Sequence, residues 1–417
     1  MTVAQDILSH LEQELPWQRE LYIDLHQNPE LSFQEQRTAG IIEEKLTAFG
    51  YQVQRIGGTG VVGILYNGEG RTVLSRADID ALPVTEATGL PYASTVRATD
   101  ATGAEVGVMH ACGHDMHVAT LLGAAKLMAD HQDKWQGTYI ALFQPAEEVA
   151  GGALAMVHDG LVNRIPRPDV ALSQHLINFE TGRTGINPGP TLSAGDSIKI
   201  TLFGRGSHGS MPHNSVDPAV LASAVVLRLQ GIVSREVAPG TFAVVTVGSV
   251  QVGAKSNIIT DHATLLVNVR AYDLDVRAKV LAAIERVVRG ECAASGSPAE
   301  PTFEYYDQYP LTSNDPTVTE TVHQALLAHY GEQLVFTSQP ATASEDFSHI
   351  PDAFGTPYTY WTFGGTDTHT YQAAVAAGRV ALDIPANHSP YFAPVIDPTL
   401  GTGTSNHVVA AAAYLAK

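Results

Sequence analysis

Residues 138–148 of this 417-residue chain read Thr-Tyr-Ile-Ala-Leu-Phe-Gln-Pro-Ala-Glu-Glu. The apolar run up to Phe143 has the composition of a buried strand, and two adjacent glutamates follow its end. A helical pattern over 114–130 precedes this strand, and a β-rich run over 170–173 follows it. Strands that alternate with helices in this way indicate an α/β layer structure with a mostly parallel sheet.

The alternation extends back to the start of the chain. Helices are expected over 4–27 and 35–49, and strands over 60–66 and 72–76. At the far end of the chain, residues 301–417 return to mixed α/β and finish in an alanine-rich helix over 405–416.

The order of elements changes after Pro188. A strand, a helix, two strands and a helix are expected in turn, over 197–203, 218–233, 242–252, 263–270 and 275–292. This order predicts a small separate α+β domain. We therefore expect a discontinuous main domain, 1–187 and 301–417, with a second domain inserted at 188–300.

Composition and charge narrow the function classes. A hydrophobic fraction of 44% with 16% charged residues is typical of a globular protein. The formal net charge of −19 argues against surfaces that bind nucleic acid or anionic membranes, because both need clustered Lys and Arg. Two cysteines exclude a disulfide framework. Neither a signal peptide nor an uninterrupted apolar stretch of ~20 residues is visible, so we expect a cytoplasmic protein.

One short segment concentrates metal-binding side chains. Residues Met109–His117 read Met-His-Ala-Cys-Gly-His-Asp-Met-His. Thiolate, imidazole and carboxylate are the usual ligands of zinc and similar transition metals. Cys112 and His114 are two residues apart, so in an extended segment both side chains lie on one side and can converge on an ion. The alternative is a buried cysteine among polar loop histidines.

Carboxylates follow two of the expected strands. Glu147 and Glu148 are adjacent, and two carboxylates buried together need a cation or a shared proton. Beside a metal, one can bind the ion and the other can act as a general base. Asp78 and Asp80 follow the strand over 72–76 and share a face, because side chains alternate with a period of two. A solvated pair that opens a helix and a turn with capping aspartates are the respective alternatives.

Two histidines complete the pattern. His175 ends the apolar strand that begins at Val170, and His388 lies near the C-terminus in the segment Asn387–Pro390. Each is a weak signal alone, since a histidine at a strand end is more often structural. Because parallel strands end at one edge of a sheet, the two carboxylate pairs and His175 are expected to meet there. That arrangement favours a metal hydrolase with paired ions.

Several stretches, in order along nearly the whole chain, resemble the M20 metallopeptidase family. They are Leu25–Ser32, Arg76–Pro83, His110–His117, Gln144–Glu148, Gly206–His213, Ser344–Phe347 and Asn387–Pro390. The resemblance is to the amidohydrolase branch, which holds aminoacylases, hippurate hydrolases and auxin-conjugate hydrolases. It implies a catalytic α/β domain with an inserted ferredoxin-like lid and dimerisation domain. Asp78 stands where peptidase members carry a ligand histidine, which argues for this branch.

The resemblance also implies a metal site. The ligands of two divalent ions per subunit would be Cys112, His114, Glu148, His175 and His388. Cys112 would bridge the ions, where peptidase branches use an aspartate. Zinc, manganese, cobalt and nickel are the candidate ions, since thiolate and imidazole suit them better than calcium or magnesium.

Five further residues resemble catalytic and substrate-binding groups of the family. Glu147 resembles the general base, and Asp80 the aspartate that orients a ligand. His208 resembles the histidine that stabilises the oxyanion, which in dimeric relatives serves the partner subunit. Asn257 and Arg270 resemble inserted-domain residues that meet the substrate carboxylate.

The implied reaction is hydrolysis of N-acyl amino acids to a carboxylic acid and a free amino acid by a metal-activated water. We expect a homodimer, partly because β-runs of the inserted domain can pair edge to edge, and no nucleic-acid or membrane partner. An M20-type dipeptidase or carboxypeptidase is the main alternative. A thiol hydrolase that uses Cys112 as nucleophile and a non-catalytic metal-binding protein are two others.

Overall fold

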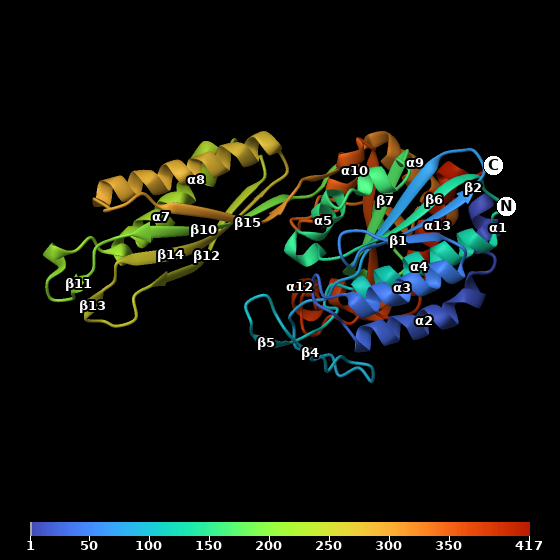
Figure 1. Ribbon diagram of the computed structural model, residues 1–417, viewed down its shortest axis with the longest axis horizontal. Helices are drawn as coiled ribbons and strands as arrows, with labels where there is room; N and C mark the ends of the chain where they lie inside the picture. The colour runs from blue at the N-terminus through green and yellow to red at the C-terminus, as the bar shows by residue number, and fades with distance from the viewer. Residues whose placement is uncertain (1) are drawn as a thin grey trace. The chain divides into compact units, whose positions relative to one another are not determined.

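The computed structural model describes residues 2–417, which form two compact units (Figure 1). The main unit comprises the chain up to Thr191 together with Ser313–Pro340 and Asp346–Lys417. The inserted unit comprises Leu192–Thr312 and Ala341–Glu345. The domain boundaries expected from the sequence, at 187/188 and 300/301, stay a prediction.

The main unit is built on an eight-stranded sheet of order β1-β2-β6-β3-β7-β18-β8-β17. In its middle, β3 runs parallel to β6 and β7, and β18 runs parallel to β7. The sheet is therefore mixed and largely parallel at its centre, which is the α/β class that the sequence predicts. Its strands are β1 (Gln52–Arg55), β2 (Val61–Asn67), β3 (Thr72–Asp78), β6 (Gly137–Gln144), β7 (Val170–Glu180), β8 (Thr184–Ile186), β17 (Val335–Thr337) and β18 (Tyr358–Thr366).

Helices cover both faces of this sheet. Strand β6 is buried along its whole length, which explains why its sequence is a continuous apolar run rather than an alternating one. Helix α4 packs against α2 and α13 and against β3, β6 and β7. The helices of the main unit are α1 (Val3–Leu8), α2 (Leu11–Gln27), α3 (Gln36–Ala48), α4 (His114–Asp130), α5 (Gly152–His158), α6 (Leu161–Arg164), α9 (Pro316–Tyr330), α10 (His349–Phe354), α11 (Thr368–Ala376), α12 (Val380–Asp383) and α13 (Thr399–Leu415).

The single helix expected over 4–27 is two helices. The backbone N–H and the hydroxyl of Ser9 both donate to the carbonyl of Asp6, and α1 ends there. Apolar spacing does not reveal this break, because the buried side chains stay in phase across it. Two short pairs of strands form separate two-stranded sheets: β4 (Arg97–Thr99) with β5 (Glu105–Gly107), and β9 (Gly189–Leu192) with β16 (Thr312–Asn314).

The inserted unit has an antiparallel sheet of order β12-β14-β10-β15 with two long helices. Along β14, Leu265, Val267 and Val269 are buried, and the residues between them are partly exposed. This alternation places one face of the sheet against the helices. The elements are β10 (Ala194–Phe203), β11 (Ser207–His208), α7 (Pro218–Glu236), β12 (Ala243–Val252), β13 (Ile258–Ile259), β14 (His262–Ala271), α8 (Leu274–Ser295) and β15 (Thr302–Tyr309).

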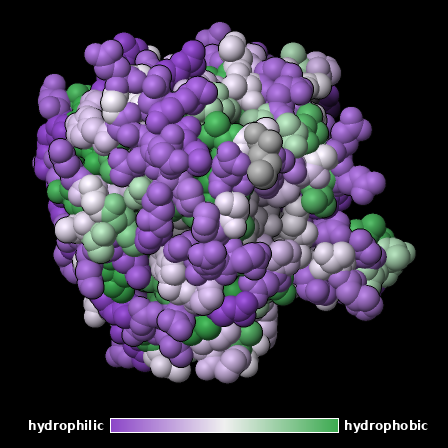
Figure 2. Space-filling model, turned by 90° about the vertical axis from the view of Figure 1, so that its right-hand side faces the viewer, coloured by the Kyte–Doolittle hydropathy of each residue, from purple (hydrophilic) through white to green (hydrophobic). Residues whose placement is uncertain are grey.

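Helix α7 is, within residues 2–417, the one helix long and apolar enough to cross a membrane. It buries Leu221, Val225 and Leu229 in the core of the inserted unit. A core helix meets the same criterion, so this is weak evidence of a span. Figure 2 shows a face of the main unit on which apolar side chains are scattered among hydrophilic ones, as is usual for a protein surface.

Candidate metal centre and active site

The central parallel strands deliver charged side chains to one edge of the main sheet. Strand β3 ends at Asp78, and β6 ends at Gln144 and leads into the short 3-10 helix Glu147–Val149. His175 lies within β7, which continues to Glu180 rather than ending at the histidine. Helix α4 begins at His114, two residues after Cys112.

The five residues expected as metal ligands lie in one cluster. The ligand atoms of Cys112, Glu148 and His388 lie within 4.8 Å of one another. Cys112 Sγ is 3.4 Å from His175 Nε2, and Glu148 Oε2 is 3.4 Å from His388 Nε2. Glu148 Oε1 lies 3.8 Å from His114 Nε2. Segments that are far apart in the sequence therefore present sulfur, nitrogen and oxygen donors to one small volume.

The hydrogen bonds of this cluster leave the donor atoms available to a metal ion. Asp80 Oδ1 lies 3.3 Å from His114 Nδ1, and the carbonyl of Leu176 lies 2.6 Å from His175 Nδ1. Metal-binding histidines commonly donate their second ring N–H in this way. His114 Nε2 and Glu148 Oε1 are buried and have no hydrogen-bond partner. Orphaned buried polar atoms of this kind fit a bound cation.

Burial and neighbouring charges shift the pKa values of the donor groups in this cluster. Burial raises the pKa of the Cys112 thiol above its usual range and raises the pKa of Glu148 to about 8. Burial lowers the pKa values of His175 and His388 below their usual value. Those two imidazoles are thus held neutral, as a ligand must be. For His114 burial also lowers the pKa, but the charge of Asp78 and the hydrogen bond with Asp80 outweigh burial and raise the pKa well above its usual value. A cation here would favour the ionised thiol and carboxylate.

The carboxylate of Asp80 contacts three groups around the site. It accepts hydrogen bonds from Ser32 Oγ at 2.7 Å and from the Glu148 N–H at 3.1 Å, besides its contact with His114. Burial alone would raise the pKa of Asp80, but the hydrogen bonds and the charge of His114 lower it below its usual value. Glu147 is buried beside Glu148, and its ligand atom groups with those of His114 and Glu148.

Sequence reasoning gave Arg76 and His117 no role at the metal site, and His117 only one as a possible partner of Cys112 in the thiol-hydrolase alternative; both lie beside the cluster. Arg76 is fully buried, and its Nη1 donates to Asp78 at 2.7 Å. His117 Nδ1 lies 2.5 Å from Asp78, and its Nε2 accepts the N–H of Leu176 at 2.7 Å. Asp78 and His117 are therefore both engaged by protein groups. The available signals were an arginine inside an apolar strand and the third histidine of the segment Met109–His117.

A buried ion pair supports the start of α4. His26 Nδ1 lies 2.7 Å from Asp115, and His26 Nε2 lies 3.2 Å from Glu86. Burial lowers the pKa of His26, but the hydrogen bonds to Asp115 and Glu86 outweigh it and raise the pKa to about 10. Asp115 directly follows His114, so this pair ties α2 to the segment that carries two expected ligands.

The inserted unit carries the remaining expected site residues, in two places. His208 and Asn257 are exposed neighbours, since the Gly209 N–H donates to the Asn257 carbonyl at 2.8 Å. Asn257 lies just before β13, which leads directly into His262, the first residue of β14. Arg270 lies near the other end of β14. Eight residues at ~3.4 Å each put these two ends of the strand ~27 Å apart. The unit therefore does not bring Asn257 and Arg270 together.

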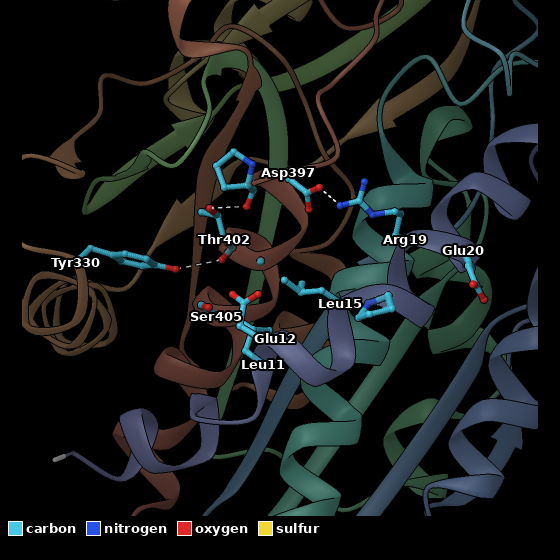
Figure 3. A pocket seen from close by; sticks show the side chains of 12 residues that line it. Leu11, Glu12, Leu15, Arg19, Glu20, Tyr330, Asp397, Thr402 and Ser405 are labelled. Atoms are coloured by element: carbon cyan, nitrogen blue, oxygen red, sulfur yellow. Dashed lines mark hydrogen bonds and ion pairs between the residues drawn. The ribbon is translucent and has the colours of Figure 1, made fainter.

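A separate groove lies between α2, α9 and α13 of the main unit (Figure 3). Its volume is about 720 Å³. Arg19 pairs with Asp397 there, and the Tyr330 hydroxyl donates to the carbonyl of Thr402 at 3.2 Å. None of the expected site residues lines this groove, and its labelled polar groups are partly paired with one another.

Comparison with known proteins identifies relatives. The model of peptidase family M20/M25/M40 matches residues 74–380. The chain is 38% identical to N-acetyl-L-cysteine deacetylase of Bacillus subtilis, over 82% of this chain and 79% of that protein. It is 34% identical to thermostable carboxypeptidase 2 of Saccharolobus solfataricus, over 84% and 86%. The solved YXEP protein of Bacillus subtilis, described as a dinuclear metal-binding peptidase of the M20 family, shares 27% identity with a TM-score of 0.74, over 96% and 98%.

The buried His26 pair predicts a pH dependence of stability. Its folded-state pKa of about 10 exceeds the usual ~6.5, so its contribution is full below ~6.5 and is lost as pH rises through about 10. We expect the unfolding free energy of wild type to exceed that of His26→Gln most near pH 6, and the difference to shrink toward pH 10. Urea unfolding measures this. His213→Gln, at an exposed histidine, is the control; a His26→Gln difference that stays constant with pH would contradict the prediction.

Proposed function

Because the chain belongs to peptidase family M20/M25/M40, it is a metal-dependent hydrolase of amide bonds, and we propose that its substrates are N-acyl amino acids. The products would be a carboxylic acid and a free amino acid. The observation that carries this proposal is Cys112, whose sulfur lies in the ligand cluster at 3.4 Å from His175 Nε2. In the resembling amidohydrolase branch a cysteine bridges the ions, where peptidase branches use an aspartate.

The bonding of Asp78 supports the same branch. This residue stands where peptidase members carry a ligand histidine, and here it is engaged by Arg76 and His117. A carboxypeptidase activity is the second candidate, favoured by the relative from Saccharolobus solfataricus. A dipeptide substrate carries a free amino group, which needs an acidic partner beside the acyl side of the site.

We propose that two divalent cations are held by the five clustered donors, Cys112, His114, Glu148, His175 and His388. When bound, such ions supply Lewis acidity that lowers the pKa of water and polarises a carbonyl. Zinc, manganese, cobalt and nickel suit this donor set. The two cysteines are free thiols, which supports a reducing, cytoplasmic location.

Glu147 is the proposed general base. It takes a proton from the attacking water and delivers it to the leaving nitrogen. Its neighbour Glu148 has its N–H bonded to Asp80 and its carboxylate between His114 and His388, which suits a ligand. We therefore propose that Glu147 transfers the proton while Glu148 binds the metal.

Three residues of the inserted unit have the chemistry to recognise the rest of the substrate. Arg270 donates to Asn268 Oδ1 and Ser344 Oγ, both neutral, and within residues 2–417 it makes no ion pair with a carboxylate. Its half-buried guanidinium suits a substrate carboxylate. We propose the same role for Asn257 in the site that His208 serves, because Asn257 lies beside His208 and away from Arg270. His208 Nδ1 accepts the Ser210 N–H at 3.1 Å, so the proton of a neutral ring lies on Nε2. That N–H is a suitable donor for an oxyanion.

We propose that the chain forms a homodimer in which His208 serves the site of the partner subunit. The supporting fact is that β11, which carries His208, pairs with the segment just before His262, whereas Arg270 lies ~27 Å further along β14 from His262. One copy of this unit cannot bring both to one small substrate. Strand β12 is an edge strand, and Val220 and Leu227 on α7 are 67% and 75% exposed. An open edge beside exposed apolar side chains suits pairing across a two-fold axis.

The substrate proposal is tested with a panel of N-acetyl and N-benzoyl amino acids and of dipeptides. We expect enzyme reconstituted with Mn²⁺, Co²⁺ or Zn²⁺ to release amino acids from the N-acyl compounds and not from dipeptides. A chelated sample is the control and should be inactive. Preferential cleavage of dipeptides would replace the proposal by the peptidase alternative, and activity that persists in chelator but is lost on thiol alkylation would favour a Cys112 nucleophile.

Because Glu147 is the proposed base and Glu148 a proposed ligand, their glutamine variants should lose different properties. Glu147→Gln should lower kcat by at least about 100-fold while the metal content stays the same, because general-base catalysis contributes ~10²–10⁴. Glu148→Gln should lower the metal content, since it removes an anionic donor. Kinetics and elemental analysis of the same preparations measure both. Substantial activity in metal-loaded Glu147→Gln would show that another group is the base.

The dimer proposal predicts complementation between inactive variants. His208→Ala and Glu147→Gln should each be nearly inactive alone. After subunit exchange, a mixed dimer would hold one site with both residues intact, so about a quarter of wild-type activity should return. Two variants of the same site, His208→Ala mixed with His208→Asn, are the control. If the mixture of His208→Ala and Glu147→Gln regains no activity although mass spectrometry shows subunit exchange, His208 does not act in the site of the partner subunit.

A further inference from the structure

Glu35 is a buried carboxylate that sequence reasoning did not single out and the proposed chemistry does not use. It lies at the N-terminal boundary of α3 and is fully buried. Its Oε1 accepts the N–H groups of Phe33 and Ala146, each at 2.9 Å, and its Oε2 accepts the Thr59 hydroxyl at 2.6 Å. A carboxylate so engaged on both oxygens acts as a scaffold rather than as a ligand or base.

We propose that Glu35 is a positioning residue for Glu147, because it holds the N–H of the residue from which the glutamate turn starts. This inference rests on the proposed role of Glu147 as general base. Ala146 directly precedes Glu147, yet lies 111 residues from Glu35 in the chain.

The backbone conformation of Ala146 explains why its N–H needs a fixed hydrogen-bond acceptor. Ala146 has φ +47° and ψ +43°, in the left-handed region that non-glycine residues rarely adopt. Such strain persists only where surrounding contacts impose it. The Ala146 carbonyl accepts the Gly152 N–H at 3.0 Å, and a Cβ on Gly152 would lie 1.5 Å from the Pro145 carbonyl. The turn is therefore closed on one side by Gly152 and on the other by Glu35.

The position of Glu147 follows from these anchors. The N–H before it, on Ala146, is bound by Glu35, and the N–H after it, on Glu148, is bound by Asp80. Without the Glu35 acceptor, Ala146 can relax to a common backbone conformation, which rotates the peptide that leads into Glu147. Catalytic groups are sensitive to shifts of about 1 Å, which can cost ~100-fold in rate.

Hydrogen-bond acceptance, rather than charge, is the property that a variant has to keep. Burial and the nearby charge of Asp80 raise the pKa of Glu35 to about 7. In Glu35→Gln the amide oxygen can accept the Phe33 and Ala146 N–H groups, while the amide nitrogen can donate to Thr59. Glu35→Met keeps a similar length but removes every acceptor.

The test compares Glu35→Met, Glu35→Gln and a matched control, Glu30→Met. The Glu30 carboxylate lies in the same loop and caps the N–H groups of Arg37 and Thr38, at 2.9 and 2.8 Å. Its loss therefore removes two similar bonds without touching the glutamate turn. With Mn²⁺-loaded protein, we expect Glu35→Met to lower kcat by about 10- to 100-fold with KM and metal content little changed. Glu35→Gln and Glu30→Met should keep most of the wild-type kcat.

Hydrogen–deuterium exchange of the segment 145–150 gives a readout that does not depend on activity. Exchange should speed up in Glu35→Met and stay slow in Glu35→Gln and Glu30→Met. If wild type cleaves none of the amides tested, the proposed substrates are wrong, and the exchange comparison still decides whether Glu35 holds the turn. Wild-type kcat with unchanged exchange in Glu35→Met would overturn the inference, as would a loss of metal in place of a fall in kcat.

Discussion

The buried carboxylate of Asp80 is the contact on which the site depends. It accepts hydrogen bonds from Ser32 and from the Glu148 N–H, and it faces His114 Nδ1. It thus links the loop before α3, the turn after β6 and the start of α4. Bonding to three partners favours its ionised form despite burial. The orientation of His114 and Glu148 follows, and with it the availability of their unpaired atoms.

Burying this many charges requires compensation within the main unit. Arg76 is fully buried under the site and pairs with Asp78, which also engages His117. A second buried pair joins His26 to Asp115. An unpaired charge at such depth would cost several kcal/mol, and in these two pairs each charged group is accompanied by an opposite one. In the cluster around Cys112, His114 Nε2 and Glu148 Oε1 have no hydrogen-bond partner, and a metal ion bound there would supply one.

Much of the fold follows from local patterns. The apolar run before Glu147 predicts a buried central strand, and the alternation of elements predicts the α/β class. Those signals are local because backbone periodicity sets them. Local patterns do not predict that β15 pairs with β10 in the inserted unit, because the two strands are about a hundred residues apart in the chain. Nor does apolar spacing reveal the break at Ser9, which depends on a side-chain hydrogen bond.

Residue identity is enough to set the chemistry available at the site: the residue types of Met109–His117 and the glutamate pair, each beside a predicted strand or helix. Which of these groups are free to bind or react depends on contacts between distant segments of the chain. The tertiary structure commits Asp78 to Arg76 and His117, and it places Glu35 on the N–H of Ala146. The physical reason is that these contacts depend on strand order and on one strained turn, which bring together positions that no short stretch of sequence relates.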